Sequence, residues 1–136
     1  MNKTSHFIVV DDDQVNNMIC RTTIKKVSPM ADIQTFNVPE EAFEYISIRY
    51  AEKVDLTILF LDINMPGWSG WDFLDNFEIL NEQIKKKIQI YMLSSSIDPT
   101  DKQRAIENNN VVGYLEKPLS IATVSAILDV QMKINL

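Results

Sequence analysis

Histidine and cysteine are almost missing from this chain, which has one residue of each kind, His6 and Cys20. A lone cysteine cannot form a disulfide within the chain, and its place in a helical pattern predicts a small buried or half-buried residue. A lone histidine excludes metal sites built on several histidines. We also do not expect the chain to donate a phosphoryl group from a phosphohistidine of its own.

Positive charge and long apolar runs are also scarce. The 13 lysines and arginines against 19 aspartates and glutamates give a net charge of −6, which argues against sequence-independent binding to nucleic acid. No apolar stretch approaches the roughly 18 residues that span a membrane, and the N-terminus lacks the apolar centre of a signal peptide. We therefore expect a cytoplasmic protein that contacts neither a membrane nor nucleic acid directly.

What the chain does have is an alternation of strand and helix patterns. At 136 residues, 46% of them hydrophobic, one domain over residues 1–136 with no output domain is expected. Five apolar runs predict strands at 7–10, 33–36, 57–61, 88–93 and 111–116. Five helices are predicted at 14–27, 39–50, 70–80, 98–108 and from 121 onward. This alternation is typical of βαβ units and a parallel sheet. In the first helix one face is shared by four residues, Val15, Ile19, Thr22 and Lys26, with Met18 and Thr23 beside them.

Four of the five runs end in polar residues. These residues are Asp11-Asp12-Asp13, Asp62, Ser94-Ser95-Ser96 and Lys117-Pro118. Strands of a parallel sheet all point the same way, so these residues should gather at its carboxyl edge, where such folds place their sites. One such residue alone is usually a turn or a helix cap, the role expected of Asp13. Their joint occurrence, each on its own strand end, favours a shared site.

The residues at this edge suit a divalent cation and a phosphoryl group. Asp11, Asp12 and Asp62 would repel one another unless a cation lay among them, and Mg²⁺ prefers such hard oxygen ligands. Lys117 would add a positive charge and Ser94 a hydroxyl donor for the oxygens of a transferring group. An aspartate can itself be the nucleophile.

These segments resemble the receiver domain of bacterial two-component response regulators. The similarity covers essentially the whole chain and is most specific in Leu61-Asp62-Ile63-Asn64-Met65-Pro66-Gly67 together with Lys117-Pro118. It implies an α/β fold: a doubly wound, five-stranded parallel sheet of the flavodoxin-like (βα)5 type, strand order 2-1-3-4-5. It also implies Mg²⁺ as the cofactor.

The resemblance implies a role for each site residue. Asp62 matches the phosphoacceptor, Asp12 the direct magnesium ligand and Asp11 its neighbour that acts mainly through water. The backbone carbonyl of Asn64 matches the third protein ligand.

A second group matches residues that respond to phosphorylation. Ser94 and Lys117 match the hydroxyl and the lysine that contact the phosphoryl group. Tyr114 matches the aromatic residue that changes rotamer with the hydroxyl, although a packing role on the last helix is an equal alternative. Ser94 is serine where threonine is commoner. The long interval between Asp12 and Asp62 suggests an extended segment near 49–55.

Two alternatives stay open. Asp11-Asp12-Asp13-Gln14-Val15 also fits the D-x-D-x-[TV] pattern of haloacid-dehalogenase-like phosphatases, with Asp11 as nucleophile and Asp13 as general acid. That interpretation leaves Asp62 without a role, and only Asp129 could serve as a later acidic residue. The other alternative is a receiver-like binding module that takes no phosphate, although such modules usually lack part of the acidic set or the lysine.

The leading prediction is a phosphoacceptor signalling protein rather than an enzyme with an outside substrate. A sensor histidine kinase or a histidine phosphotransfer protein would supply the phosphoryl group, and a downstream protein target would read the result. By analogy, the exposed contact candidates are four residues of the fourth predicted helix, Thr100, Lys102, Gln103 and Ala105.

Overall fold

The computed structural model describes residues 5–50 and 56–134. Five strands in these ranges form one parallel sheet in the order β2-β1-β3-β4-β5, which confirms the expected fold class. The strands are β1 (His6–Val10), β2 (Asp32–Phe36), β3 (Thr57–Asp62), β4 (Ile88–Ser94) and β5 (Val111–Glu116). Every residue of the central β3 is buried, as expected for a strand covered on both faces.

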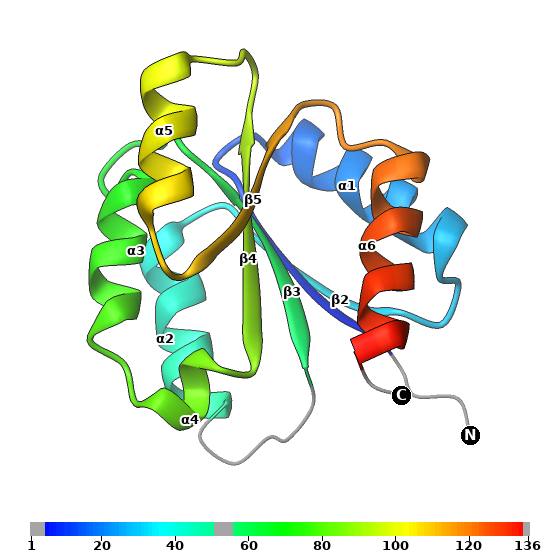
Figure 1. Cartoon of the computed structure of the whole chain (residues 1–136), viewed down its shortest axis with the longest axis horizontal. Coiled ribbons are helices and arrows are strands. Elements are labelled where there is room, and N and C mark those ends of the chain that lie inside the picture. Colours follow the sequence, from blue (N-terminus) through cyan, green and yellow to red (C-terminus); the bar gives the residue numbers. More distant parts are fainter. Residues whose placement is uncertain (1–4, 51–55, 135–136) are drawn as a thin grey trace.

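Helices cover both faces of this sheet. They are α1 (Gln14–Val27), α2 (Pro39–Arg49), α3 (Gly70–Glu78), α4 (Glu82–Lys85), α5 (Pro99–Glu107) and α6 (Ile121–Ile134). Figure 1 shows α1 and α6 on one side of the sheet and α2, α3 and α5 on the other. None of the helices in the described ranges is both long enough and apolar enough to cross a membrane.

The prediction of five helices missed α4, which makes six in the described ranges. This helix has four residues, too few for a periodic apolar pattern, and turns only Ile84 into the core. The Asn81 side chain caps it by accepting a hydrogen bond from Gln83 N at 2.7 Å. The extended segment expected near 49–55 falls largely on residues 51–55, outside the described ranges, and α2 ends at Arg49.

The starts of the helices follow from local sequence. Asp13 caps α1, since its Oδ1 accepts the Val15 amide at 2.9 Å, as the sequence predicts. Pro39 occupies the first turn of α2, where its missing N–H leaves no bond unmade. Ser69 and Asp72 form a reciprocal capping box at the start of α3.

The inward face of α1 lies elsewhere than its apolar pattern suggests. Val15 is 65% exposed and Met18 68% exposed. The buried residues of this helix are Asn16, Asn17, Cys20 and Ile24. The expectation of a buried Cys20 is confirmed, whereas the face marked by Val15 and Ile19 points to solvent.

The register of the strands brings the polar strand ends together. Val10 pairs with Leu61, which places Asp11 next to the level of Asp62. Asp62 pairs with Leu93 and Ser94 pairs with Glu116, so Ser94 and Lys117 follow one step farther along. The predicted convergence at the carboxyl edge of the sheet is therefore a property of the fold.

Candidate functional site

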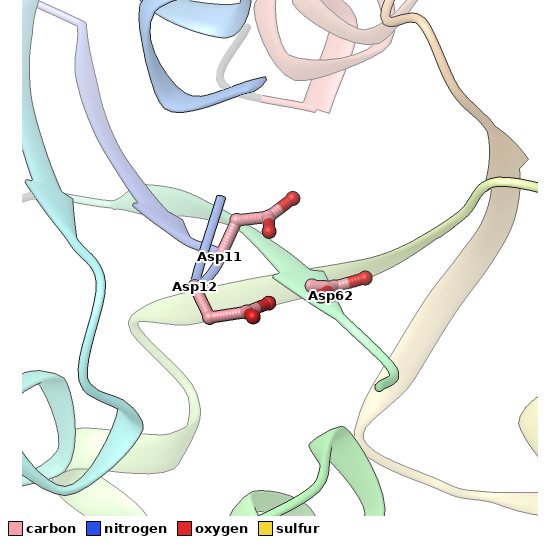
Figure 2. Close-up of side chains that lie close together, drawn as sticks. All are labelled: Asp11, Asp12 and Asp62. Carbon is pink, nitrogen blue, oxygen red and sulfur yellow. The ribbon is translucent and has the colours of Figure 1, made fainter. Parts of the chain in front are cut away.

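Three carboxylates meet where β1 and β3 end. Asp11, Asp12 and Asp62 each offer an oxygen, and these oxygens lie within 4.8 Å of one another. Figure 2 shows the three side chains projecting toward the same side from the two neighbouring strand ends. Asp11 and Asp62 are buried, whereas Asp12 is exposed. Hard oxygens at this spacing, one of them open to solvent, fit a magnesium ion.

Lys117 reaches into this cluster from the end of β5. Its Nζ lies 2.7 Å from Asp11 Oδ2 and 2.9 Å from Asp62 Oδ1. The backbone holds it there, because Lys117 N donates to the Ser94 carbonyl at 2.7 Å. The side chain thus supplies one positive charge between two buried carboxylates, which would otherwise repel each other.

Burial and neighbouring charge shift the pKa values of this pair. Burial, together with the negative charge of Asp11, raises the pKa of Asp62 to about 6, although the hydrogen bond from Lys117 opposes the rise. Burial by itself would lower the pKa of Lys117, but its hydrogen bonds and charge interactions with Asp11 and Asp62 raise it above the ordinary value. Lys117 therefore stays charged at neutral pH.

Asp11 is held more firmly than sequence reasoning anticipated. Its Oδ1 accepts the Asp13 amide at 2.9 Å, and its Oδ2 accepts Asn16 Nδ2 at 2.7 Å as well as Lys117. Its backbone carbonyl accepts Asn17 Nδ2 at 2.9 Å. Neither asparagine was predicted from the sequence to contact the site. The signal that could have found them is their spacing, which places them on one helix face with Cys20 and Ile24.

The predicted switch residues lie beside the site without entering it. The Ser94 hydroxyl is buried and donates to the Ser96 carbonyl at 2.5 Å. The half-buried Tyr114 donates its hydroxyl to the same carbonyl at 3.4 Å and lies 3.5 Å from the Asp98 amide that donates to it. Both side chains therefore converge on Ser96, so a movement of Ser94 would change the surroundings of Tyr114.

A backbone hydrogen bond closes the loop between β3 and α3 at its end. Asn64, which follows Asp62 by two residues, is exposed. Gly70 N donates to the Ile63 carbonyl at 2.7 Å, which closes the loop. A Cβ on Gly70 would lie 2.5 Å from the Asp62 carbonyl, so glycine is required for α3 to start this close to the acceptor strand. Gly67 has a φ of +75°, a left-handed conformation that favours glycine.

Comparison with known families identifies the chain. The family profile described as "Response regulator receiver domain" matches residues 7–129. The chain belongs to this family. It is therefore a phosphoacceptor signalling protein of two-component systems, a class whose members bind Mg²⁺ in an acidic pocket.

Individual relatives agree with this assignment. The chain is 26% identical over 132 residues to chemotaxis protein CheY-3 of Vibrio cholerae, covering 95% of this chain and 92% of that protein. A two-component response regulator of Cytophaga hutchinsonii superposes with a TM-score of 0.88 at 29% identity, covering 97% and 99% of the two chains. A response regulator receiver protein of Dyadobacter fermentans superposes with a TM-score of 0.84 at 26% identity, covering 93% of this chain and 96% of that protein.

The family match goes against the phosphatase alternative. The geometry agrees, because Asp11, the nucleophile in that interpretation, accepts hydrogen bonds at both carboxylate oxygens. Asp13, its general acid, is an exposed helix cap. The binding-module alternative is not favoured either, since the acidic residues and the lysine are all present and in contact.

Proposed function

We propose that Asp62 accepts a phosphoryl group from a phosphohistidine. The observation that supports this choice is the different engagement of the two buried carboxylates. Asp11 accepts hydrogen bonds at both of its oxygens, whereas Lys117 contacts Asp62 through Oδ1. Asp62 therefore keeps an oxygen for attack while Lys117 fixes the orientation of its carboxylate.

The reaction at Asp62 is an in-line displacement. A carboxylate oxygen of Asp62 forms a bond to phosphorus, and the bond between phosphorus and the imidazole nitrogen of the donor breaks. The electron pair of that bond leaves with the imidazole. Asp12, the Asn64 backbone carbonyl and Asp62 would hold Mg²⁺, with Asp11 acting mainly through water. The ion would neutralise charge on the phosphoryl oxygens. The domain assists its own modification in this way and acts on no outside substrate.

Phosphorylation would then change the surface beyond the site. Lys117 would follow the phosphoryl oxygens, and the Ser94 hydroxyl would leave the Ser96 carbonyl to donate to them. Tyr114, which shares that carbonyl, would repack. The output is a shift between two arrangements of the surface built by α5, β5 and α6.

The partners of this surface would be proteins. A sensor histidine kinase or a histidine phosphotransfer protein would serve as the phosphoryl donor, and a downstream target protein would bind at α5. Thr100, Lys102 and Gln103 are exposed on α5 and remain contact candidates. Ala105 does not, because it is 1% exposed and packs in the core beneath the helix. The sequence-based choice of Ala105 was wrong because helical spacing turns that position toward the sheet.

Labelling of the protein with acetyl phosphate and Mg²⁺ tests this function. We expect magnesium-dependent incorporation in the natural chain and none in Asp62→Asn. Lys117→Ala should still bind Mg²⁺ but lose the coupling of phosphorylation to changes in the Tyr114 environment, followed by NMR. Normal labelling of Asp62→Asn would contradict the assignment.

A further inference from the structure

Two adjacent asparagines are buried on the inward face of α1. Asn16 and Asn17 are each 6% exposed, at positions where a helix packed on a sheet usually carries apolar side chains. Burying an amide is unfavourable unless hydrogen bonds compensate it. Asn17 Oδ1 is, within the described ranges, a buried polar atom without a hydrogen-bond partner. Stability alone does not explain this pair.

Both amides are directed at one residue of the site. Asn16 Nδ2 donates to Asp11 Oδ2 at 2.7 Å and lies 3.7 Å from Cys20 Sγ. Asn17 Nδ2 donates to the Asp11 carbonyl at 2.9 Å and to the Phe36 carbonyl at 3.3 Å. One asparagine thus holds the carboxylate of Asp11, and the other holds its backbone between the ends of β1 and β2.

We propose that Asn16 is a positioning residue for the magnesium site: it fixes the Asp11 carboxylate independently of Lys117. This inference rests on the proposed function, in which Asp11 belongs to that site. Asn16 and Lys117 donate to the same oxygen, Oδ2, each at 2.7 Å. The amide is neutral and anchored on a helix, whereas the lysine is a charged side chain that the phosphoryl group would draw away.

The hydrogen bond from Asn16 matters when Lys117 moves away from Asp11 toward the phosphoryl group. A buried carboxylate oxygen that loses its only donor carries a large desolvation penalty. With Asn16 in place, Asp11 Oδ2 keeps a donor and Oδ1 keeps the Asp13 amide. The Asp11 carboxylate therefore holds one orientation with Lys117 in either position, and the phosphoryl group can recruit Lys117 more easily.

Substitution of Asn16 in the full chain tests this inference. Asn16→Leu keeps the branched shape and removes the donor, and Asn16→Ala removes it with a small residue in case leucine does not fit. With Mg²⁺ alone as the probe, NMR titration should show the dissociation constant rise about 10- to 100-fold in both variants, the usual effect of losing a group that orients a metal site. Thermal unfolding verifies that each variant is folded.

A second readout needs no metal. The Asp13 amide donates to Asp11 Oδ1, so its hydrogen exchange reports whether the carboxylate is held. We expect faster exchange at Asp13 in Asn16→Leu. Ile24→Val, two turns farther on the same buried face, is the control and should change neither the magnesium affinity nor exchange at Asp13.

The outcomes separate the two claims. If the natural chain binds Mg²⁺ and both Asn16 variants bind it equally well with unchanged Asp13 exchange, the role of Asn16 is refuted and the proposed function stands. If the natural chain binds no Mg²⁺, the proposed function fails and this inference fails with it.

Discussion

Helices α1 and α3 make an instructive pair. Each follows a strand with a site aspartate in its last position or directly after it, and each starts at a side-chain cap. The inward face of α3 is entirely apolar over Trp71, Phe73, Leu74 and Phe77, whereas α1 buries two asparagines in its first turns. One helix supports the sheet through packing, and the other supports the site through hydrogen bonds.

The same contrast appears on the outer surface of α1. Three of its apolar side chains, Val15, Met18 and Ile19, are exposed, while its polar asparagines are buried. Amphipathic periodicity therefore describes α3 and misleads for α1. A helix whose buried face serves a polar site need not show the hydrophobic pattern that a packing helix shows.

Truncation of the apolar face of α3 should give the largest loss of stability. Phe73 is fully buried and packs edge-on against Phe43, with ring centroids 6.1 Å apart. We expect Phe73→Ala to lower the free energy of unfolding by about 3–5 kcal/mol, measured by urea titration. Asp75→Ala, on the exposed face of the same helix, is the control and should change little. A loss below about 1 kcal/mol for Phe73→Ala would contradict the view that α3 supports the sheet through apolar packing.

The buried Asp62 carboxylate should lower the stability of the folded state at neutral pH. The pKa of Asp62 is raised from 3.8 to about 6, so without Mg²⁺ the folded state binds its proton more tightly than the unfolded state. This contribution makes stability fall as pH rises from about 4 to about 6, by on the order of 2 kcal/mol. Asp62→Asn should lack that part of the pH dependence and be more stable than the natural chain at pH near 7.5.

Two comparisons check the origin of this effect. Mg²⁺ should raise the midpoint of thermal unfolding of the natural chain at neutral pH, because binding to the folded state stabilises it, and should do so far less in Asp62→Asn. Equal stabilities of the two proteins across the pH range would show that burial does not perturb Asp62.

The exposed apolar side chains of α1 should matter least for stability. Val15→Ser and Met18→Ser remove side chains that are 65% and 68% exposed. We expect each to change the free energy of unfolding by less than about 0.5 kcal/mol, measured in the same urea titrations. A loss comparable to that of Phe73→Ala would mean that this face is covered in the folded protein.

Most of the fold could be predicted from the sequence because its signals are local. The apolar runs located all five strands, and Asp13 and Pro39 marked two helix starts. The site prediction succeeded for a related reason: residues that follow parallel strands meet at one edge whatever the loops do. Asp11, Asp12, Asp62 and Lys117 are accordingly in contact or within a few ångströms.

The features that escaped prediction depend on tertiary contacts. Asn16 and Asn17 are unremarkable in the sequence, and their importance comes from the Asp11 groups that the fold places beside them. Helix α4 is too short to show a period, and the burial of Ala105 depends on how α5 sits on the sheet.

Locating the phosphorylated residue is the sharpest test of the role of Asp62. After labelling with acetyl phosphate and Mg²⁺, borohydride reduction of the acyl phosphate and peptide mapping by mass spectrometry would identify the modified aspartate. We expect modification at Asp62, the carboxylate that Lys117 contacts at one oxygen. Modification at Asp11 would contradict this role.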